Sequence, residues 1–424
     1  MKSLESYTCH TEHSEVSCNT ESSLDLPLES LSLQPFLQSL HKEQWQEVRL
    51  GEVAEITSSK RIFYSEYVEY GIPFYRSKEI IEFSKGNNPQ NELFIDENKY
   101  NDIANKFGVP QANDILLTSV GTLGIPYLVP KDKKFYFKDG NLTWFKNFKN
   151  ITSLFLFYWF KSPQGKEKLD SIAIGSTQQA LTIQGMKNLI FLLPPLTIQQ
   201  KIAEILSSFD DKIDLLHRQN KTLESLALTL FRHYFIDNPK RNEWEEKPLS
   251  EVAYFLNGLA CQKLPPRNDK DRLPVLKIKE LKEGISQASD WATSEIDSQY
   301  IVENGDVIFA WSASLMVKMW NGSRCVLNQH LFKVTSQVYP KWFYYFWCKY
   351  HLQDFIAIAN AHATTMGHIK RQDLDLAMCV IPDTQSLQTI DKEIAPLLQK
   401  ININSKQIQN LQAMRDMLLK AIFA

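Results

Sequence analysis

The sequence has few cysteines and no long apolar run, and these absences set the first limits on its class. Its six cysteines are scattered and form no Cys-x-x-Cys pair, which excludes a structural zinc module and favours free thiols in a reducing compartment. No apolar run reaches the roughly 18 residues that a membrane-spanning helix needs, and the N-terminus has no signal-type apolar core. We therefore expect a cytoplasmic protein with no membrane partner. The cysteines are Cys9, Cys18, Cys261, Cys325, Cys348 and Cys379.

An excess of charge of one sign is also absent. Lys and Arg total 47 against 49 Asp and Glu, so the formal net charge is −2. The whole chain thus gives no indication of nucleic acid, although a single face could still be basic, because affinity follows the local field. With 424 residues, of which 43% are hydrophobic, the chain is long enough for two or three folded domains.

Catalytic motifs are missing as well. The sequence has no Gly-x-x-x-x-Gly-Lys phosphate loop, no Gly-x-Gly-x-x-Gly turn, no His-Glu-x-x-His and no Asn-Pro-Pro-aromatic tetrapeptide. Glu280-x-Lys282 has no upstream partner carboxylate, so we interpret it as surface charge. His330, His362 and His368 have no carboxylate or cysteine at useful spacing, and we expect no metal site. These absences favour a binding protein over an enzyme.

Residues 1–40 differ in composition from the rest of the chain. They are rich in Ser, Thr and Glu and poor in aliphatic side chains, which predicts a flexible leader. Cys9, His10, His13 and Cys18 match no zinc spacing, so the leader is not expected to hold a metal.

What the sequence does contain is an internal repeat. The offset between the copies is 199 residues at Trp45 and Trp244 and 188 residues at Leu230 and Leu418, so only small insertions separate them. The chain is therefore interpreted as a tandem duplication, each copy being a globular unit followed by a long helix. The clearest pairs are WQEVRLGEVAEI (45–56) with WEEKPLSEVAYF (244–255), NDILLTSVGTLG (113–124) with GDVIFAWSASLM (305–316), and LFYWFKS (156–162) with YYFWCKY (344–350).

The globular units have the pattern of mixed α/β domains. Short β-branched and aromatic runs bounded by turn residues predict strands, and SLFLFYWFKS and KWFYYFWCKY predict buried helices. We expect an α/β fold class, with two similar mixed α/β domains separated by two long helices that form an antiparallel coiled coil. The predicted strands include 115–118, 135–137, 307–311 and 331–334.

Each long helix has an apolar seam in alternating steps of four and three residues, kept over about four heptads. Asn220 interrupts the first seam, and a polar residue there lowers stability but fixes the register of a helix pair. Pro396 is expected to kink or restart the second helix. The predicted seam is Ile202, Leu206, Phe209, Ile213, Leu216, Asn220, Leu223 and Leu230 in the first helix, and Ile394, Leu397, Ile401, Asn404, Ile408, Leu411 and Leu418 in the second.

The simplest way to bury both apolar seams is to pair the two helices antiparallel, because a globular unit lies between them in the sequence. At about 1.5 Å per residue the pair would hold the units apart along a rod of roughly 50 to 60 Å. A rod of this length could separate two DNA-reading units or two protein-binding modules, so the length alone leaves both open.

Polar and basic residues near turns are the candidates for contact with DNA. Phosphate neutralisation needs Lys and Arg, while Arg, Gln and Asn are the side chains that address base edges bidentately. Equivalent places in the two copies carry different polar residues, which suggests one scaffold that reads two different sequences. The candidates are Lys60, Arg61, Arg76, Lys78, Ser119, Thr122, Ser176, Thr177, Gln178 and Gln179 in the first copy, and Arg267, Lys277, Lys279, Trp311, Ser312, Ser314, Asn328, Gln329, His330, Thr364 and His368 in the second.

The segment LPPLTIQQKIAEILSSFDDKIDLLHRQNKTLESLALTLF (193–231) closely resembles the central spacer of the specificity subunits of type I restriction-modification systems. GSTQQALT (175–182) and FAWSASL with LNQHLFKV (309–315 and 327–334) are similar to parts of their target recognition domains. The resemblance covers residues from about 41 to 424. The second copy departs from it, since VIPDTQSLQTI (380–390) lacks the Pro-Pro and Gln-Gln features.

The leader (1–40) has no counterpart in the resemblance, which implies target recognition domains at 41–195 and 237–382 and spacer helices at 196–236 and 383–424. It implies double-stranded DNA with a bipartite target as the ligand, with two methyltransferase subunits and translocating endonuclease subunits as partners. S-adenosylmethionine and ATP would be bound by those partners, and this chain would hold no cofactor. The alternatives are a protein-binding scaffold built on a coiled coil and a self-contained methyltransferase or nuclease.

Overall fold

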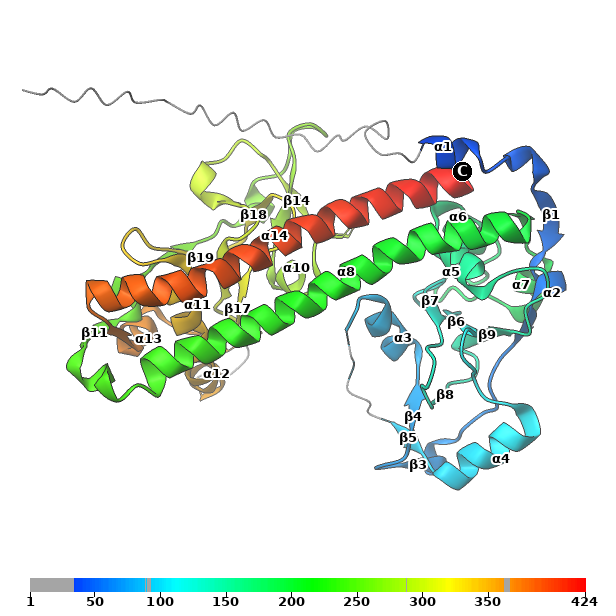
Figure 1. Cartoon of the computed structure of the whole chain (residues 1–424), viewed down its shortest axis with the longest axis horizontal. Helices are drawn as coiled ribbons and strands as arrows, with labels where there is room; N and C mark the ends of the chain where they lie inside the picture. The colour runs from blue at the N-terminus through cyan, green and yellow to red at the C-terminus, as the bar shows by residue number, and fades with distance from the viewer. Residues whose placement is uncertain (1–33, 88, 90–92, 287, 362–366) are drawn as a thin grey trace, which may run out of the picture.

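The computed structural model describes residues 34–87, 89, 93–286, 288–361 and 367–424. Two α/β units lie toward opposite ends of a pair of long helices (Figure 1). The predicted leader is too long at its C-terminal end, because helix α1 (Gln34–Gln38) and Leu40 precede the first unit and Leu40 is only 1% exposed in its core. Apolar side chains in this short stretch have a core to pack against. Residues 1–33 of the predicted leader lie outside the described residues.

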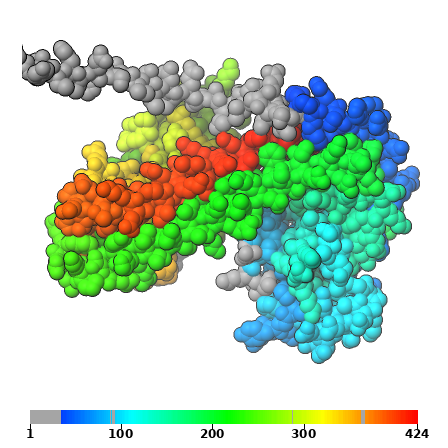
Figure 2. Space-filling model, viewed as in Figure 1, coloured from blue at the N-terminus to red at the C-terminus, as the bar shows by residue number. Residues whose placement is uncertain are grey.

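The long helices are α8 (Leu196–Phe231), which continues into the π-helical segment η4 (Arg232–Ile236), and α14 (Thr384–Phe423). They run antiparallel and side by side, and the space-filling view shows them as one continuous ridge that joins the two units (Figures 1 and 2). Tyr234 at the end of α8 donates a hydrogen bond to Glu393 near the start of α14 (2.9 Å). The predicted antiparallel pairing is confirmed.

Helix α14 does not restart at Pro396, contrary to one of the two outcomes expected from the sequence. A proline inside a helix removes one backbone donor and crowds the preceding turn. Pro396 is exposed, so its ring lies on the outer face of the helix, where water can hydrogen-bond the carbonyl that loses its partner.

The predicted seam residues are all buried or half-buried in α8 and α14, but the seam of α14 is shifted at one point. Leu398 is buried (7% exposed), whereas Leu397, chosen from the heptad pattern, is only half-buried. A straight helix has 3.6 residues per turn, and over several turns the inward-facing position therefore drifts away from a strict seven-residue repeat.

The first unit contains two four-stranded sheets. One has the order β2-β9-β6-β7 and is antiparallel, and the other has the order β3-β5-β4-β8, in which β4 and β8 are parallel. The predicted strand 115–118 is found as β6. The strands are β2 (Glu55–Thr57), β3 (Tyr67–Val68), β4 (Ile72–Tyr75), β5 (Phe94–Ile95), β6 (Ile115–Thr118), β7 (Pro126–Leu128), β8 (Tyr136–Phe137) and β9 (Leu142–Lys146).

The second unit repeats most of this arrangement. Its sheets have the orders β12-β19-β16-β17 and β14-β13-β18-β15, and β13 and β18 are parallel as β4 and β8 are. The antiparallel sheet is repeated strand for strand, but the mixed sheets differ in their fourth strand, because β3 pairs with β5 in the first unit and β15 pairs with β18 in the second. The strands are β12 (Tyr254–Asn257), β13 (Leu273–Leu276), β14 (Trp291–Ala292), β15 (Ile301–Val302), β16 (Val307–Ala310), β17 (Met316–Met319), β18 (Cys325–Leu327) and β19 (Leu331–Thr335).

Shorter helices and two antiparallel ribbons complete the units. The ribbons pair β1 (Gln46–Arg49) with β10 (Ile190–Leu193) and β11 (Glu245–Pro248) with β20 (Met378–Ile381), so each joins the start of a unit to its end. The helices are α2 (Leu50–Val53), α3 (Ser77–Ser84), α4 (Glu97–Phe107), α5 (Ser153–Lys161), α6 (Pro163–Ser171), α7 (Ile183–Asn188), α9 (Leu249–Val252), α10 (Ile278–Glu283), α11 (Lys341–Tyr350), α12 (Leu352–Ala361) and α13 (Arg371–Leu376).

Each unit builds its core from both long helices. The core of the first unit contains Ile202 and Leu206 from the start of α8, together with Leu418 and Ile422 from the end of α14. The core of the second unit likewise contains residues from the end of α8 and the start of α14. The aromatic helices predicted to be buried are α5 and α11, and they pack in these cores. None of the described helices combines the length and the apolarity needed to cross a membrane.

Candidate nucleic-acid interface

In the first unit, several of the candidate residues converge on one edge of the sheets. Arg61 follows β2 and its guanidinium lies 3.0 Å from the carboxylate of Asp139, in the loop after β8. The carbonyl of Asn141 in the same loop accepts hydrogen bonds from the Ser119 amide (2.9 Å) and the Ser77 hydroxyl (3.3 Å). The loop between β8 and β9 therefore connects the segments that follow β2, β4 and β6.

The glutamine-rich segment joins the same edge. Ala180 forms backbone bridges with Val120 and with Ile174, and the amide of Gly121 donates to the carbonyl of Gln179 (3.3 Å). The loop after β6 and the segment before α7 thus lie side by side, although about sixty residues of chain separate them. The exposed candidates here are Thr122, Ser176, Thr177, Gln178 and Gln179.

In the second unit, the candidates gather around Trp311. Ser312 forms a backbone bridge with His368, and the amide of Ile369 donates to the carbonyl of Trp311 (3.1 Å). The Ser312 hydroxyl lies 3.2 Å from Nδ1 of His330, and the Gln329 amide lies 3.4 Å from its other ring nitrogen. Serine, glutamine and imidazole groups from three separate segments therefore form one polar cluster.

The two edges share a backbone geometry. Gly121 (φ 78°) and Ala313 (φ 57°) occupy equivalent repeat positions in the left-handed region, and so do Asn113 (φ 69°) and Gly305 (φ 89°). In both units the loop after the central strand pairs with the segment that precedes a short helix. The scaffold is conserved between the copies while the polar side chains on it differ.

Three candidates are buried, and their polar groups are engaged inside the unit. Ser119 (3% exposed) lies 2.6 Å from the Thr143 hydroxyl and donates to the carbonyl of Leu117. Asn328 and Ser312 are also buried. These side chains support the loops, and their part in direct contact with DNA stays a prediction.

The basic candidates are mostly paired with carboxylates. The guanidinium of Arg76 contacts buried Glu79 through two nitrogens (2.7 and 3.3 Å), and Lys277 forms an ion pair with Asp290. Arg267 lies 2.7 Å from Glu295. Lys60 lies over the ring of Phe107, 4.5 Å from its centroid.

The loop that bears Arg267 carries acidic as well as basic side chains. Asp271 accepts hydrogen bonds from the hydroxyls of Ser294 and Thr293, and these bonds lower the pKa of its carboxyl to about 2. Arg272 is paired with Asp269 (3.0 Å) and stacks over Trp291. This loop therefore carries fixed charges of both signs, with Arg267, Lys270 and Arg272 against Asp269 and Asp271.

The remaining candidates are exposed near these segments or lie outside the described residues. Lys78 and Lys279 are exposed near the starts of α3 and α10, and Ser314 is exposed after β16. Thr364 lies outside the described residues, as does His362. Among the described residues, no group of three or more His, Cys, Asp or Glu side chains converges in a way that could hold a metal ion.

Two kinds of residue at these edges were missed from the sequence. Asn257, at the end of β12, accepts a hydrogen bond from the indole of Trp311 (3.2 Å), a contact that only the sheet topology brings together. Tyr64, just before β3, and Tyr70, between β3 and β4, are 90% and 85% exposed. Aromatic residues are ordinarily assigned to a core, so composition gave no signal for them.

The comparisons with known proteins agree with this architecture. The family model described as the type I restriction modification DNA specificity domain matches residues 42–225 and 241–413. The chain is 26% identical over 416 residues to the type I restriction enzyme MjaIX specificity subunit of Methanocaldococcus jannaschii, covering 90% of this chain and 93% of that protein. It is 28% identical over 165 residues to the putative type I restriction enzyme specificity subunit S.HindORF215P of Haemophilus influenzae, covering 38% of this chain and 40% of that protein.

A solved structure shares the fold. The crystal structure of a type I restriction-modification system S subunit from M. genitalium matches with a TM-score of 0.54 and 16% identity, covering 90% of this chain and 96% of that one. The two stretches matched by the family model each contain one α/β unit and most of its long helix. The chain therefore belongs to the family of type I restriction modification DNA specificity domain proteins.

Proposed function

We propose that this chain is the DNA-recognition subunit of a type I restriction-modification complex, and that each α/β unit reads one half of a bipartite, asymmetric target. In this proposal residues 41–195 and 237–382 are the recognition domains, and 196–236 and 383–424 are the spacer. Partner subunits carry out the chemistry in the cytoplasm. Two methyltransferase subunits would bind S-adenosylmethionine and methylate adenine, and ATP-dependent endonuclease subunits would cleave.

One observation carries the proposal: the same loop pairing in the two units presents different polar side chains. The first unit presents hydroxyl and amide groups, among them Gln178 and Gln179, while the second presents His330 and His368 beside Trp311. Glutamine can hydrogen-bond adenine through two of its atoms, and hydroxyls can address bases or phosphates. One scaffold with two sets of readers is what a split, asymmetric target requires.

The long helices support the same proposal by separating the two edges. The 36 residues of α8 span about 54 Å at the usual helical rise. Equivalent faces of a DNA duplex recur every 34 to 36 Å or so, and two units on such a rod can therefore reach two sites on one duplex.

The test is genome-wide detection of N6-methyladenine in host cells with and without this gene. We expect a split motif that disappears on deletion and returns on complementation. Restoring the gene with Gln178→Ala and Gln179→Ala together should relax or abolish recognition of one half-site and leave the bases of the other half unchanged. A change in both halves would contradict separate reading.

The protein-binding scaffold makes an opposite prediction for purified protein. A reader that contacts phosphates loses affinity for duplex DNA steeply as salt rises. Binding that is absent, or that does not respond to salt, in the assembled complex would favour the scaffold.

A further inference from the structure

In each α/β unit, a tyrosine and a lysine both contact one carboxylate of α8, and we call this contact a junction. In the first unit, the Tyr158 hydroxyl and the Lys161 ammonium from α5 both contact Asp210 at 3.1 Å. In the second unit, Tyr345 and Lys349 from α11 both contact Glu224 at 2.6 Å. The helices α5 and α11 are equivalent in the repeat, and so are Lys161 and Lys349. The tyrosines and the carboxylates occupy non-equivalent positions, so the two units form a similar contact with different residues.

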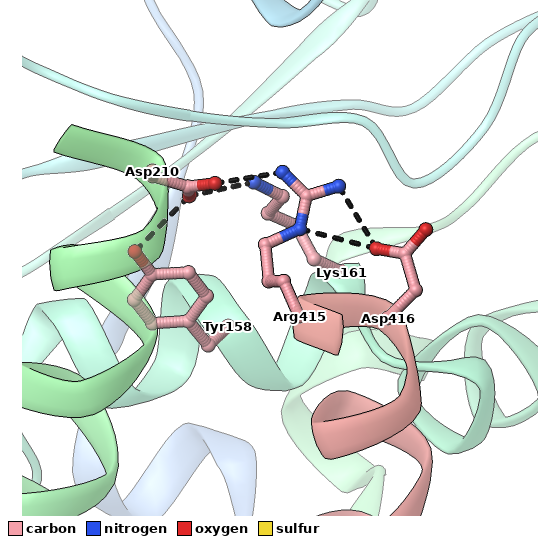
Figure 3. A network of polar contacts seen from close by, with 5 residues as sticks. All are labelled: Tyr158, Lys161, Asp210, Arg415 and Asp416. Atoms are coloured by element: carbon pink, nitrogen blue, oxygen red, sulfur yellow. Dashed lines mark hydrogen bonds and ion pairs between the residues drawn. The ribbon is translucent and has the colours of Figure 1, made fainter. Parts of the chain in front are cut away.

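The first junction also includes α14. The guanidinium of Arg415 contacts Asp210 (2.7 Å) with one nitrogen and Asp416 (2.8 Å) with another, so Asp210 joins α5, α8 and α14 at one point (Figure 3). The side chains of Lys161, Asp210 and Arg415 are 28%, 27% and 18% exposed, so solvent reaches them only in part.

The carboxylates of both junctions are ionised at neutral pH, because the pKa of each is lowered. Burial opposes ionisation of Asp210, but Lys161 and Arg415 outweigh it and lower the pKa of its carboxyl. Burial likewise opposes ionisation of Glu224, and Lys349 and Tyr345 lower its pKa overall. Each carboxylate therefore accepts charge-assisted hydrogen bonds, which are shorter and more directional than neutral ones.

The two carboxylates have a fixed relation along α8. They are 14 residues apart in the sequence, which corresponds to about 21 Å along a helix and to directions that differ by roughly 40°. Both units therefore contact α8 on nearly the same side of that helix.

The first unit is not packed continuously against the spacer around its junction. An open cavity of about 720 Å³ lies between α3, β7 and the helix pair, and its lining includes Lys161, His217 and Arg415. A junction beside such a gap restricts rotation of the unit in a way that apolar contacts do not, because hydrogen bonds depend on angle as well as distance.

We infer that these two junctions are positioning devices that hold the recognition units at fixed orientations on α8 and thereby restrict the gap between half-sites that the complex accepts. This inference rests on the proposed function. Partly buried ion pairs add little net stability but can select one arrangement over others, which is the role assigned here to Asp210 and Glu224. Neither residue reads bases.

The experiment uses the complex of this chain with its methyltransferase subunits. Its substrates are duplexes carrying both half-sites, identified from the methylation map, with the natural gap and with gaps one or two base pairs shorter or longer. We expect Asp210→Asn and Glu224→Gln to raise methylation of the altered gaps, relative to the natural gap, by about tenfold, the order of one lost charged hydrogen bond. Base preference within each half-site should stay as in the wild type. Glu204→Gln, which removes an exposed carboxylate from the same helix, should behave as wild type.

Variants that fold and assemble, lose thermal stability and keep the wild-type gap profile would overturn the inference and leave only a structural role. Should Asp210→Asn not fold, Arg415→Lys and Tyr158→Phe disturb the same junction more gently, and their gap profiles decide in the same way. A wild-type complex that methylates no split target would overturn the proposed function and this inference with it. A wild type with a sharp gap preference that the variants share overturns the inference alone.

Discussion

At the scale of single residues, the loops after β6 and β16 differ in the backbone strain at one equivalent position. Ala313 adopts φ 57°, a left-handed conformation that costs a side chain energy, while its repeat partner Gly121 adopts φ 78° at little cost. Substitutions at these two positions therefore measure the cost of the left-handed conformation in two equivalent loops.

Ala313→Gly should stabilise the protein by about 0.5 to 1 kcal/mol, because glycine removes the steric strain of the left-handed conformation. The greater conformational entropy of glycine in the unfolded chain offsets part of that stabilisation. The reverse change, Gly121→Ala, should cost about 1 kcal/mol, since no atom lies within 4 Å of the added carbon and only the backbone resists. Urea unfolding of the two variants measures both values. A neutral Gly121→Ala would contradict the strain argument.

His351 gives the fold a dependence on pH. Its ring packs on Trp347 and lies 3.0 Å from the carbonyl of Met378, and burial lowers its pKa despite that carbonyl and Asp354. The unfolded chain therefore takes up a proton near pH 6.5 before the folded chain does. Stability is full above that pH and falls as the pH drops below it.

We expect His351→Gln to flatten the fall in unfolding free energy between pH 7 and pH 5, measured by urea unfolding across that range. Part of the slope should remain, because burial also lowers the pKa of His217. A slope identical to that of the wild type would rule out His351 as its source.

The turn residues after β6 and β16 were identified from local signals, and the structure brings both turns next to distant polar segments. Arg76 and Glu79 form a local pair three residues apart, whereas the burial of Ser119 depends on Thr143 of another strand. Periodicity describes one segment at a time and carries no information about such partners.

At the scale of elements, the polar interruption of the seam is a matched pair. Asn404, fully buried, donates its amide to Asn220 (2.9 Å), and Asn220 lies 3.4 Å from the Ser405 hydroxyl. The hydrogen bond between the two amides forms only in one register, because a slip would leave buried amides opposite apolar side chains.

Asn220→Leu should destabilise the protein by about 1 to 3 kcal/mol, since the buried Asn404 amide loses its acceptor. The double variant with Asn404→Leu should recover that loss, because both polar groups are then removed together. Chemical unfolding of the two variants decides the matter, and a double variant no more stable than the single one would contradict the pairing.

The long helices were predictable to within a residue or two, whereas several sheet strands were not. An apolar seam repeats many times within α8 and within α14, so the sequence of each segment alone is enough to predict a helix. Strands β3, β5, β14 and β15 are two residues long, which is too short for an alternation to be seen, and they exist through pairing with distant partners.

At the scale of the whole molecule, the helix pair sets the distance between the two units, and α8 and α14 must therefore have matching lengths. Inserting one matched heptad after Leu216 in α8 and after Gln407 in α14 should lengthen the accepted DNA gap by roughly one to three base pairs, since seven residues add about 10.5 Å. Methylation mapping of cells carrying the variant would measure the new gap. The same heptad inserted in α8 alone should misalign the seam and destabilise the protein, and a lengthened gap from that single insertion would refute the need for matching lengths.

The sharing of α14 between both cores also has a consequence for synthesis. Leu418 and Ile422 complete a core that begins with Leu40, so the first unit cannot close when its own segment leaves the ribosome. At roughly 5 to 20 residues per second, translation from Phe235 to the end of α14 takes about 10 to 40 s. Through that interval Ile202 and Leu206 have no partner helix and are open to chaperones and proteases. A chain that stops before α14 lacks the side chains that cover Ile202 and Leu206 in the full-length structure.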